Sequence, residues 1–316
     1  MSSSTKKVLT IIGGTGNQGG SIITTALSHP ELSSKYTLRT ITRNPDSKKA
    51  QALAAQGVEL VKGDLDDAAS LRAAFDGSHG VFGVTDFWSH NSKTKEVANG
   101  KALFDAAKAA GVKHFIWSAL PHVSKLSDGK YTHVDHFDGK AEVREYIEQN
   151  KPSGMWTTFV MPAMFLEQVK GMIFPVPGVG PALALPFPDD KVEWPLFSPS
   201  KDNGAYVMGV FESGQKADNA VVQAVSDWTT PAAAVEAVSR AAGKEVKFVT
   251  PTGEQFKANL PAPIAEDLTQ MMLWMGEFGY YGPGAKERQS ESDKWLLPGA
   301  KLLTWDAFVQ GEQWQL

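Results

Sequence analysis

A glycine-rich turn between an expected strand and an expected helix constrains the fold most. The apolar run VLTII leads directly into GGTGNQGG at residues 13–20. Gly13, Gly16 and Gly19 lie three apart, and Gly14 with the latter two gives a second register of the same pattern. Such a turn brings backbone N–H groups and a helix N-terminus close to a pyrophosphate. Because a strand precedes it and a helix follows, we favour a dinucleotide-binding turn over a tight turn without a ligand.

The first 160 residues alternate strands with helices. Expected strands are KVLTIIGG, YTLRTITRN, VELVKGD, GVFGVTD and HFIWSAL, and single helices such as SIITTALSH and KEVANGKALFDAAKAAG stand between them. Strands connected in this way pair in parallel through right-handed crossovers. We therefore predict an α/β fold with a Rossmann-type doubly wound parallel sheet.

After residue 160 the regular alternation of strands and helices ends, and Pro, Gly and Trp become common. Between residues 190 and 250, AVVQAVS and KEVKFVT are predicted to return to the sheet. Thr230, Pro231 and Gly243 are expected to cap, open and end a helix between them. The remainder, with the Met-rich LTQMMLWMGEF, predicts a smaller, partly discontinuous domain. We thus assign residues 1–160 to a dinucleotide-binding domain and 161–316 mainly to a substrate or partner domain.

One apolar stretch, GMIFPVPGVGPALALPFP at residues 171–188, has about the length of a membrane-spanning helix. Its five prolines would break the backbone ladder that lipid requires, so no membrane span is expected. We predict an apolar loop, either a surface cover on the core or a lid or wall over a substrate cleft.

Composition excludes several functions. The 316 residues include 35 acidic and 31 basic side chains, a net charge of −4, so direct binding to nucleic acid is not expected. The absence of cysteine excludes disulfides, thiolate nucleophiles and zinc–cysteine sites. The N-terminal MSSSTKK lacks the apolar core of a signal peptide, which predicts a cytoplasmic protein, with the nucleus also open.

The end of the second expected strand indicates the cofactor. An NAD site would normally place an acidic side chain there, whereas this chain has Arg43 followed by Lys48 in TRNPDSKK. A guanidinium can clamp a 2′-phosphate that a carboxylate would repel, so we predict NADP(H), against the alternative of an ordinary solvated arginine. Asp64 and Leu65 end the third strand, where an adenine is usually held, although Asp64 could equally cap a helix. Further expected cofactor contacts are Thr15, Asn17, Gln18 and Thr85.

The chain resembles the NmrA-like family of the short-chain dehydrogenase/reductase superfamily. The motifs that carry the resemblance are GGTGNQGGS, TRNP, GDLDD, VTDFW, WSAL, LTWDAFVQ and, most specifically, HFDGKAEVREYI. The resemblance covers the chain from about residue 7 to its end. It implies an NAD(P)-binding domain, a small second domain, and members that act as redox-linked regulators binding partner proteins. Related branches, similar to isoflavone reductases, are NADPH-dependent enzymes.

The resemblance leaves the catalytic residues open. Where ordinary short-chain dehydrogenases have Tyr-x-x-x-Lys on one helical face, this chain has His136 and Lys140. A nearby cation is expected to lower the pKa of His136 and make it a modest acid. By resemblance, Lys140 is expected to bind the nicotinamide ribose or to act as acid and base, and Ser118 to polarise a substrate unless it is a plain structural serine. Tyr131 is expected to face elsewhere unless the helix begins irregularly.

Other groups of residues give weaker functional signals. His133, Asp135, His136 and Asp138 are close in sequence, but they lack a third ligand on one helical face, so no metal site is predicted. Met271, Met272, Trp274 and Met275 are interpreted as core. An apolar cleft beside the nicotinamide is expected to draw on aromatic side chains that could equally be core, namely Phe87, Trp88, Phe165, Phe174 and Trp194.

Two functions remain. In the first, NADPH occupancy shifts the affinity for a regulatory protein partner, and no turnover is needed. In the second, the protein reduces a small apolar carbonyl, imine or activated alkene. The missing tyrosine favours the regulator, whereas the apolar segment and Lys140 favour the reductase. The residues alone place the regulator first.

Overall fold

The computed structural model describes residues 6–316. Residues 1–5, which make up most of the MSSSTKK lead, lie outside the described part. Within residues 6–316, no helix has the length and apolar character needed to cross a membrane.

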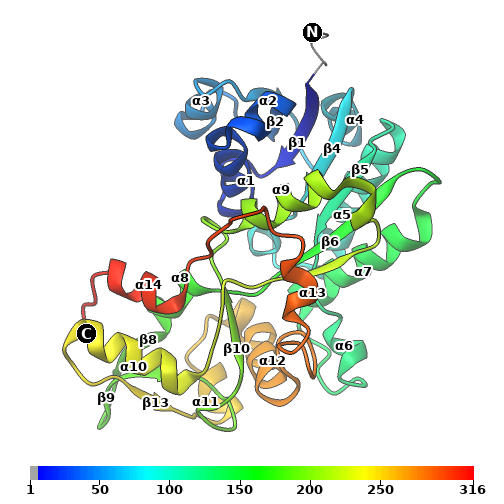
Figure 1. Cartoon of the computed structure of the whole chain (residues 1–316). Helices are drawn as coiled ribbons and strands as arrows, with labels where there is room; N and C mark the ends of the chain where they lie inside the picture. The colour runs from blue at the N-terminus through cyan, green and yellow to red at the C-terminus, as the bar shows by residue number, and fades with distance from the viewer. Residues whose placement is uncertain (1–5) are drawn as a thin grey trace.

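A seven-stranded parallel sheet forms the centre of the fold (Figure 1). Its order is β11-β6-β5-β4-β1-β2-β3. The strands are β1 (Lys7–Ile12), β2 (Tyr36–Thr42), β3 (Glu59–Lys62), β4 (Ser78–Gly83), β5 (His114–Ser118), β6 (Trp156–Pro162) and β11 (Val221–Ala224). The chain runs outward from β1 in one direction and then from β4 in the other, which leaves a crevice at the carboxyl ends of these two strands. The predicted doubly wound sheet is confirmed.

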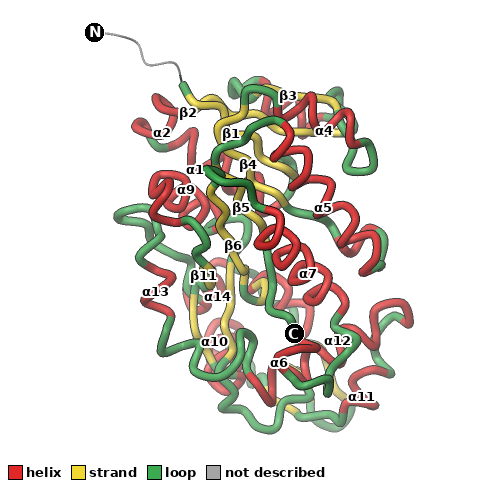
Figure 2. Tube along the Cα trace, turned by 90° about the vertical axis from the view of Figure 1, so that its right-hand side faces the viewer, coloured by secondary structure: helices red, strands yellow, loops and turns green. Residues whose placement is uncertain are grey.

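Helices cover both faces of this sheet (Figure 2). One face carries α1 (Asn17–Ser28), α2 (Pro30–Lys35) and α9 (Asn203–Ser213), and the other carries α4 (Ala68–Phe75), α5 (Lys93–Ala109) and α7 (Asp135–Asn150). Two short helices complete this half, α3 (Lys48–Ala54) and α6 (Val123–Leu126). Because both faces are covered, the central strands are nearly continuous apolar runs, with Ile11, Phe82 and Ile116 fully buried.

The second half of the chain builds two small sheets. One has the order β12-β10-β7 and the other β13-β9-β8. Their strands are β7 (Met164–Phe165), β8 (Ile173–Val176), β9 (Gly180–Ala184), β10 (Trp194–Phe197), β12 (Asp227–Thr229) and β13 (Lys247–Val249). The helices around them are α8 (Leu166–Val169), α10 (Pro231–Ala242), α11 (Gly253–Lys257), α12 (Ala262–Phe278), α13 (Gln289–Asp293) and α14 (Trp305–Gly311). The short 3₁₀ segments of the chain are η1 (Phe87–Ser89), η2 (Lys170–Met172) and η3 (Gly214–Ala217).

Two predictions for this half were wrong. The expected loop at residues 171–188 contains an antiparallel hairpin of β8 and β9. Pro175 is tolerated because β8 is an edge strand, where a missing N–H costs no ladder bond. KEVKFVT does not return to the large sheet, since β13 pairs with β9 instead. AVVQAVS does return, as β11 beside β6.

The helix signals of α10 are confirmed. The Thr230 hydroxyl accepts a hydrogen bond from the N–H of Ala233 at 3.2 Å, and Pro231 is the first helical residue. Gly243 ends the helix in the left-handed region, with φ +62°.

Helix α9 brings the second half of the chain against the glycine-rich turn. The N–H of Gly204 on α9 donates to the Ser21 hydroxyl on α1 at 3.0 Å, and Asn203 Nδ2 donates to the Gln18 carbonyl at 3.1 Å. A Cβ on Gly204 would lie 2.5 Å from the Ser21 carbonyl oxygen. This close approach holds the N-terminal turn of α1 in place.

We therefore expect Gly204→Ala to destabilise the fold by about 1–3 kcal/mol, because an added methyl group must push two packed helices apart. Equilibrium unfolding in urea measures the change. Gly311→Ala is the matched control, since a Cβ there meets nothing within 4 Å. Equal midpoints for the two variants would contradict this account of the α1–α9 contact.

Candidate functional site

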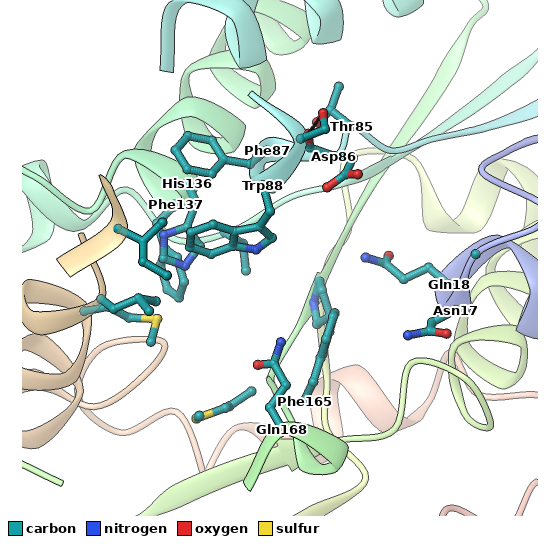
Figure 3. Close-up of a pocket in the computed structure, with 18 of the residues that line it drawn as sticks. Asn17, Gln18, Thr85, Asp86, Phe87, Trp88, His136, Phe137, Phe165 and Gln168 are labelled. Carbon is teal, nitrogen blue, oxygen red and sulfur yellow. Dashed lines mark hydrogen bonds between the residues drawn. The ribbon is translucent and has the colours of Figure 1, made fainter. Parts of the chain in front are cut away.

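A cavity of about 1680 Å³ lies along the carboxyl ends of the large sheet. Figure 3 shows Asn17 and Gln18 on one side of it and Trp88 and His136 on the other. Of the residues predicted from sequence, the cavity is lined by Gly13, Thr15, Gly16, Asn17, Gln18, Gly19, Arg43, Asp64, Leu65, Thr85, Ser118, His136 and Lys140. Lys48 is not among the lining residues; it begins α3 on an exposed face.

The glycine-rich turn forms one end of the cavity. Gly13 has φ +69°, a conformation that favours glycine, and its carbonyl accepts a hydrogen bond from the N–H of Gly16 at 2.9 Å. A Cβ on Gly19 would lie 2.8 Å from the backbone nitrogen of Gly14, so Gly19 serves packing. A Cβ on Gly16 would meet only the Gly13 carbonyl, at 3.3 Å. Gly16 also precedes α1 without any side-chain cap, which leaves the first N–H groups of the helix for another acceptor.

The ends of β2 and β3 form the next part of the wall. Arg43 is exposed and lines the cavity, and within residues 6–316 its guanidinium makes no side-chain hydrogen bond or ion pair. The capping role considered for Asp64 falls instead to Asp67, whose carboxylate accepts from the N–H groups of Ala69 and Ser70. Asp64 accepts from the N–H of Asp66 at 3.1 Å and lines the cavity.

A buried ion pair lies under the cavity between α5 and α7. The Lys140 ammonium donates to Glu96 Oε1 at 2.6 Å, to the Thr85 carbonyl at 3.1 Å and to the Thr85 hydroxyl at 2.9 Å. Glu96 is fully buried, and Lys140 nearly so. The residue before the lysine must be small, because a Cβ on Gly139 would come within 3.0 Å of Glu96 Cγ. All three ammonium protons thus have acceptors within the protein, and a ribose contact by Lys140 stays a prediction.

His136 is paired with a residue from the second half of the chain. Its Nδ1 contacts Oδ1 of Asp267 on α12, and its backbone N–H donates to Oδ2 of the same carboxylate at 3.1 Å. The ring lies beside Trp88, with centroids 4.8 Å apart, and beside Phe87 at 5.8 Å. The sequence led us to expect Lys140 as the charged neighbour of His136. Instead, Asp267 is the charged group in contact with the ring.

The remaining candidate hydroxyl groups are engaged elsewhere. The Ser118 hydroxyl donates to Gln18 Oε1 at 2.9 Å. Tyr131 precedes α7 and donates to Glu277 at 2.8 Å; burial, with this hydrogen bond, raises the pKa of its phenol. Tyr280 lines the cavity, but its hydroxyl donates to the Pro162 carbonyl at 3.0 Å. No phenol on the cavity wall is therefore free to act as the missing tyrosine.

The far half of the cavity is apolar. The β8–β9 hairpin contributes Phe174, Val176 and Val179, so part of the 171–188 segment is a wall of the cavity. Of the aromatic residues expected there, Phe87, Trp88, Phe165 and Phe174 line the cavity, whereas Trp194 is fully buried in the core. Met271 and Met272 on α12 also reach the wall, whereas Trp274 and Met275 lie in the core.

Of the four residues considered and rejected as a metal site, two have other partners. Asp138 accepts from the N–H and hydroxyl of Ser124, and His136 contacts Asp267. Within residues 6–316, no group of three or more His, Cys, Asp or Glu side chains is arranged to hold a metal ion.

The sheet with its switch point and the glycine-rich turn define a Rossmann-type α/β protein. A model of the NmrA-like family matches residues 5–309, and the chain belongs to this family. The NmrA-like family domain-containing oxidoreductase himF of Aspergillus japonicus is 31% identical over 304 residues, which cover 90% of this chain and 88% of that protein.

Two solved structures have the same fold. NmrA, a negative transcriptional regulator in complex with NADP, has a TM-score of 0.78 at 24% identity over 97% of this chain and 95% of its own. The triphenylmethane reductase of Citrobacter sp., complexed with NADP(H), has a TM-score of 0.73 at 19% identity over 96% and 99%. At these identities the likeness concerns the fold.

Sequence reasoning missed Glu96 and Asp267. Glu96 lies in the first turn of an expected helix, where an acidic residue reads as a favourable helix-end charge. Asp267 is one of three acidic residues in the Met-rich helix, with Glu266 and Glu277, and it lies more than a hundred residues from His136. The only sequence signal for a buried Glu96 is Gly139, the residue before Lys140. A glycine inside a helix can mark the close approach of another element, here α5.

We expect Lys140→Met to destabilise the fold by about 3–5 kcal/mol, because it removes the ammonium from a fully buried carboxylate whose other ionisable neighbour is the imidazole of His90, at 3.6 Å. Lys140→Met combined with Glu96→Leu is expected to recover part of this loss. Urea unfolding of the parent, the two single variants and the double variant gives the coupling energy. Additive single effects would contradict a direct ion pair.

Proposed function

We propose that this protein is an NADPH-dependent reductase of an apolar carbonyl, imine or activated alkene. The observation that carries the proposal is one continuous cavity with two chemically different halves. Backbone N–H groups and polar side chains line the half at the glycine-rich turn, and aromatic and aliphatic side chains line the other. Its volume exceeds the roughly 300–1,000 Å³ typical of a site for one small ligand, which favours a cofactor and a second molecule together.

The residues at the first half fit NADP(H). The turn at Gly13 to Gly19 and the uncapped start of α1 would hold the pyrophosphate. Arg43, which has no protein partner in the described chain, would hold the 2′-phosphate, and Asp64 and Leu65 would border the adenine. NmrA and the triphenylmethane reductase, which share the fold, were crystallised with NADP or NADP(H). The bound cofactor would supply a hydride to the molecule in the apolar half.

This proposal reverses the order that the sequence suggested. The sequence favoured a cofactor-gated regulator because the usual proton-donating tyrosine is absent. The apolar half of the cavity, with His136 at its edge, favours turnover, as does the description of the relative himF as an oxidoreductase. The regulator remains the second candidate, since NmrA itself is a transcriptional regulator and no free phenol lines the cavity.

Arg43→Ala is expected to weaken NADPH binding by about 1–3 kcal/mol and to leave NADH binding nearly unchanged, because only NADPH carries the 2′-phosphate. Calorimetric titration of both cofactors measures the difference. Lys48→Ala, which changes a nearby cation outside the cavity wall, is expected to have a smaller effect. Equal affinities of the parent for the two cofactors would refute the assignment.

Gly16→Val is expected to abolish NADPH binding while the protein stays folded, since the added side chain meets little protein but fills the approach to the pyrophosphate. Gly19→Val, by contrast, is expected to unfold the protein, because it collides with the backbone of the turn itself. Thermal unfolding and titration together separate the two effects. Normal cofactor binding by Gly16→Val would show that the turn has been misinterpreted.

The purified protein is expected to oxidise NADPH in the presence of at least one apolar acceptor. A suitable panel contains benzylideneacetone, menadione, N-benzylideneaniline and malachite green. The rate is followed as loss of NADPH absorbance against a control without acceptor. Tight NADPH binding without turnover of any member would favour the regulator.

A further inference from the structure

We propose that His136 and Asp267 form a proton-donating pair for this reduction, a proposal that rests on the reductase function above. Nε2 of His136 would donate a proton to the substrate. Asp267 would act as a positioning residue that holds the imidazole ring. The pair would thereby take the place of the tyrosine that ordinary short-chain dehydrogenases use.

The side chains of His136 and Asp267 contact each other in a buried position. Nδ1 of His136 and Oδ1 of Asp267 are buried, and apart from their mutual contact neither has a partner within residues 6–316. The second carboxylate oxygen is held by the backbone N–H of His136. The carboxylate therefore fixes the Nδ1–H tautomer and stabilises positive charge on the ring when Nε2 takes up a proton.

The other ring nitrogen is free to act on a ligand. His136 lines the cavity, and its Nε2 makes no hydrogen bond to any described residue. The rings of Trp88 and Phe87 flank the imidazole, and Trp88 is 42% exposed. Figure 3 places these side chains together on the wall opposite Asn17 and Gln18. A planar, apolar substrate lying along these rings would meet the imidazole at its edge.

Two of the charged groups near the pair have partners of their own. Lys140, one turn along α7, is neutralised by Glu96. Glu266, beside Asp267 on α12, pairs with Lys257 at 2.5 Å. The other titratable groups near the pair are Asp135 at the start of α7, His133 two residues before that helix, and His90 beyond η1, whose Nε2 lies 3.6 Å from Glu96 Oε2.

The chemistry requires such a donor only for some acceptors. As a neutral carbonyl carbon accepted the hydride that bound NADPH would supply, its π electron pair would move to oxygen, and that oxygen would take the Nε2 proton of the His136 imidazolium. The product is an alcohol, and the neutral imidazole regains a proton from water. A triphenylmethane dye cation becomes neutral on accepting hydride alone and needs no proton. The structure therefore assigns to this cavity neutral conjugated or aromatic carbonyl substrates.

The first test compares these two acceptor types in the same variants. His136→Gln and Asp267→Asn are expected to lower kcat for benzylideneacetone about 100-fold or more, as for loss of a general acid. Malachite green reduction and NADPH affinity should change by less than about threefold in both variants, because neither depends on proton transfer. His133→Gln is the matched control, since His133 is exposed just before the same helix and does not line the cavity.

A chemical rescue separates chemistry from packing. Imidazole added to His136→Ala should restore part of the carbonyl turnover by entering the space that the side chain vacates. Imidazole should not restore turnover to Asp267→Asn, which keeps its own ring. This pattern would support a proton-transfer role for His136.

A second readout does not depend on turnover. Nitrogen-15 NMR of histidine-labelled protein reports which ring nitrogen carries the proton, and loss of one signal in His136→Gln assigns the residue. The neutral ring of the parent is expected in the Nδ1–H tautomer, and Asp267→Asn should shift it to a mixture. An unchanged tautomer would overturn the positioning role of Asp267.

The outcomes distinguish this proposal from the function on which it rests. Carbonyl turnover that survives His136→Gln, or equal losses with carbonyl and dye acceptors, would overturn the proton-donating pair and leave the reductase standing. A parent protein that reduces no acceptor of the panel would overturn both.

Discussion

The buried pair of Lys140 and Glu96 is the interaction on which the site depends. It joins α5 to α7 and draws in the end of β4 through Thr85. A charge pair placed under a cavity is stable only when every partner is present, so the surrounding backbone has little freedom to shift. His136 stands one turn before Lys140 on the same helix. The ion pair therefore fixes the stretch of α7 from which His136 projects, while Asp267 on α12 contacts the ring itself.

Local sequence patterns predicted those features of the fold that depend on neighbouring residues. The turn at Gly13, the cap of α10 and the alternation of strands with helices each depend on a few adjacent residues, and they were identified correctly. The β8–β9 hairpin was missed because Pro175 and Pro181 suggest a loop when the edge position of a strand is unknown. The placement of β13 beside β9 depends on tertiary packing, which the three residues of β13 do not encode.

The same distinction applies to the site. The residues at the glycine-rich turn and at the strand ends were predicted because the topology of a doubly wound sheet brings all carboxyl ends to one edge. Lys48 was predicted from its proximity in sequence to Arg43, but the first turn of α3 carries it away from the cavity. Asp267 could not be predicted, since its meeting with His136 depends on how α12 packs against α7. Nothing in the sequence near either residue encodes that packing.

The β8–β9 hairpin has a consequence for how such a protein changes over evolutionary time. It shapes the apolar half of the cavity, yet it belongs to a small sheet that shares no strand with the large one. Substitutions at Phe174, Val176 or Val179 can therefore reshape the space offered to a second molecule while the glycine-rich turn stays intact. Selection for binding a new second molecule and selection for binding the dinucleotide then act on separate stretches of the chain. The apolar half of the cavity can therefore diversify while the cofactor site is kept.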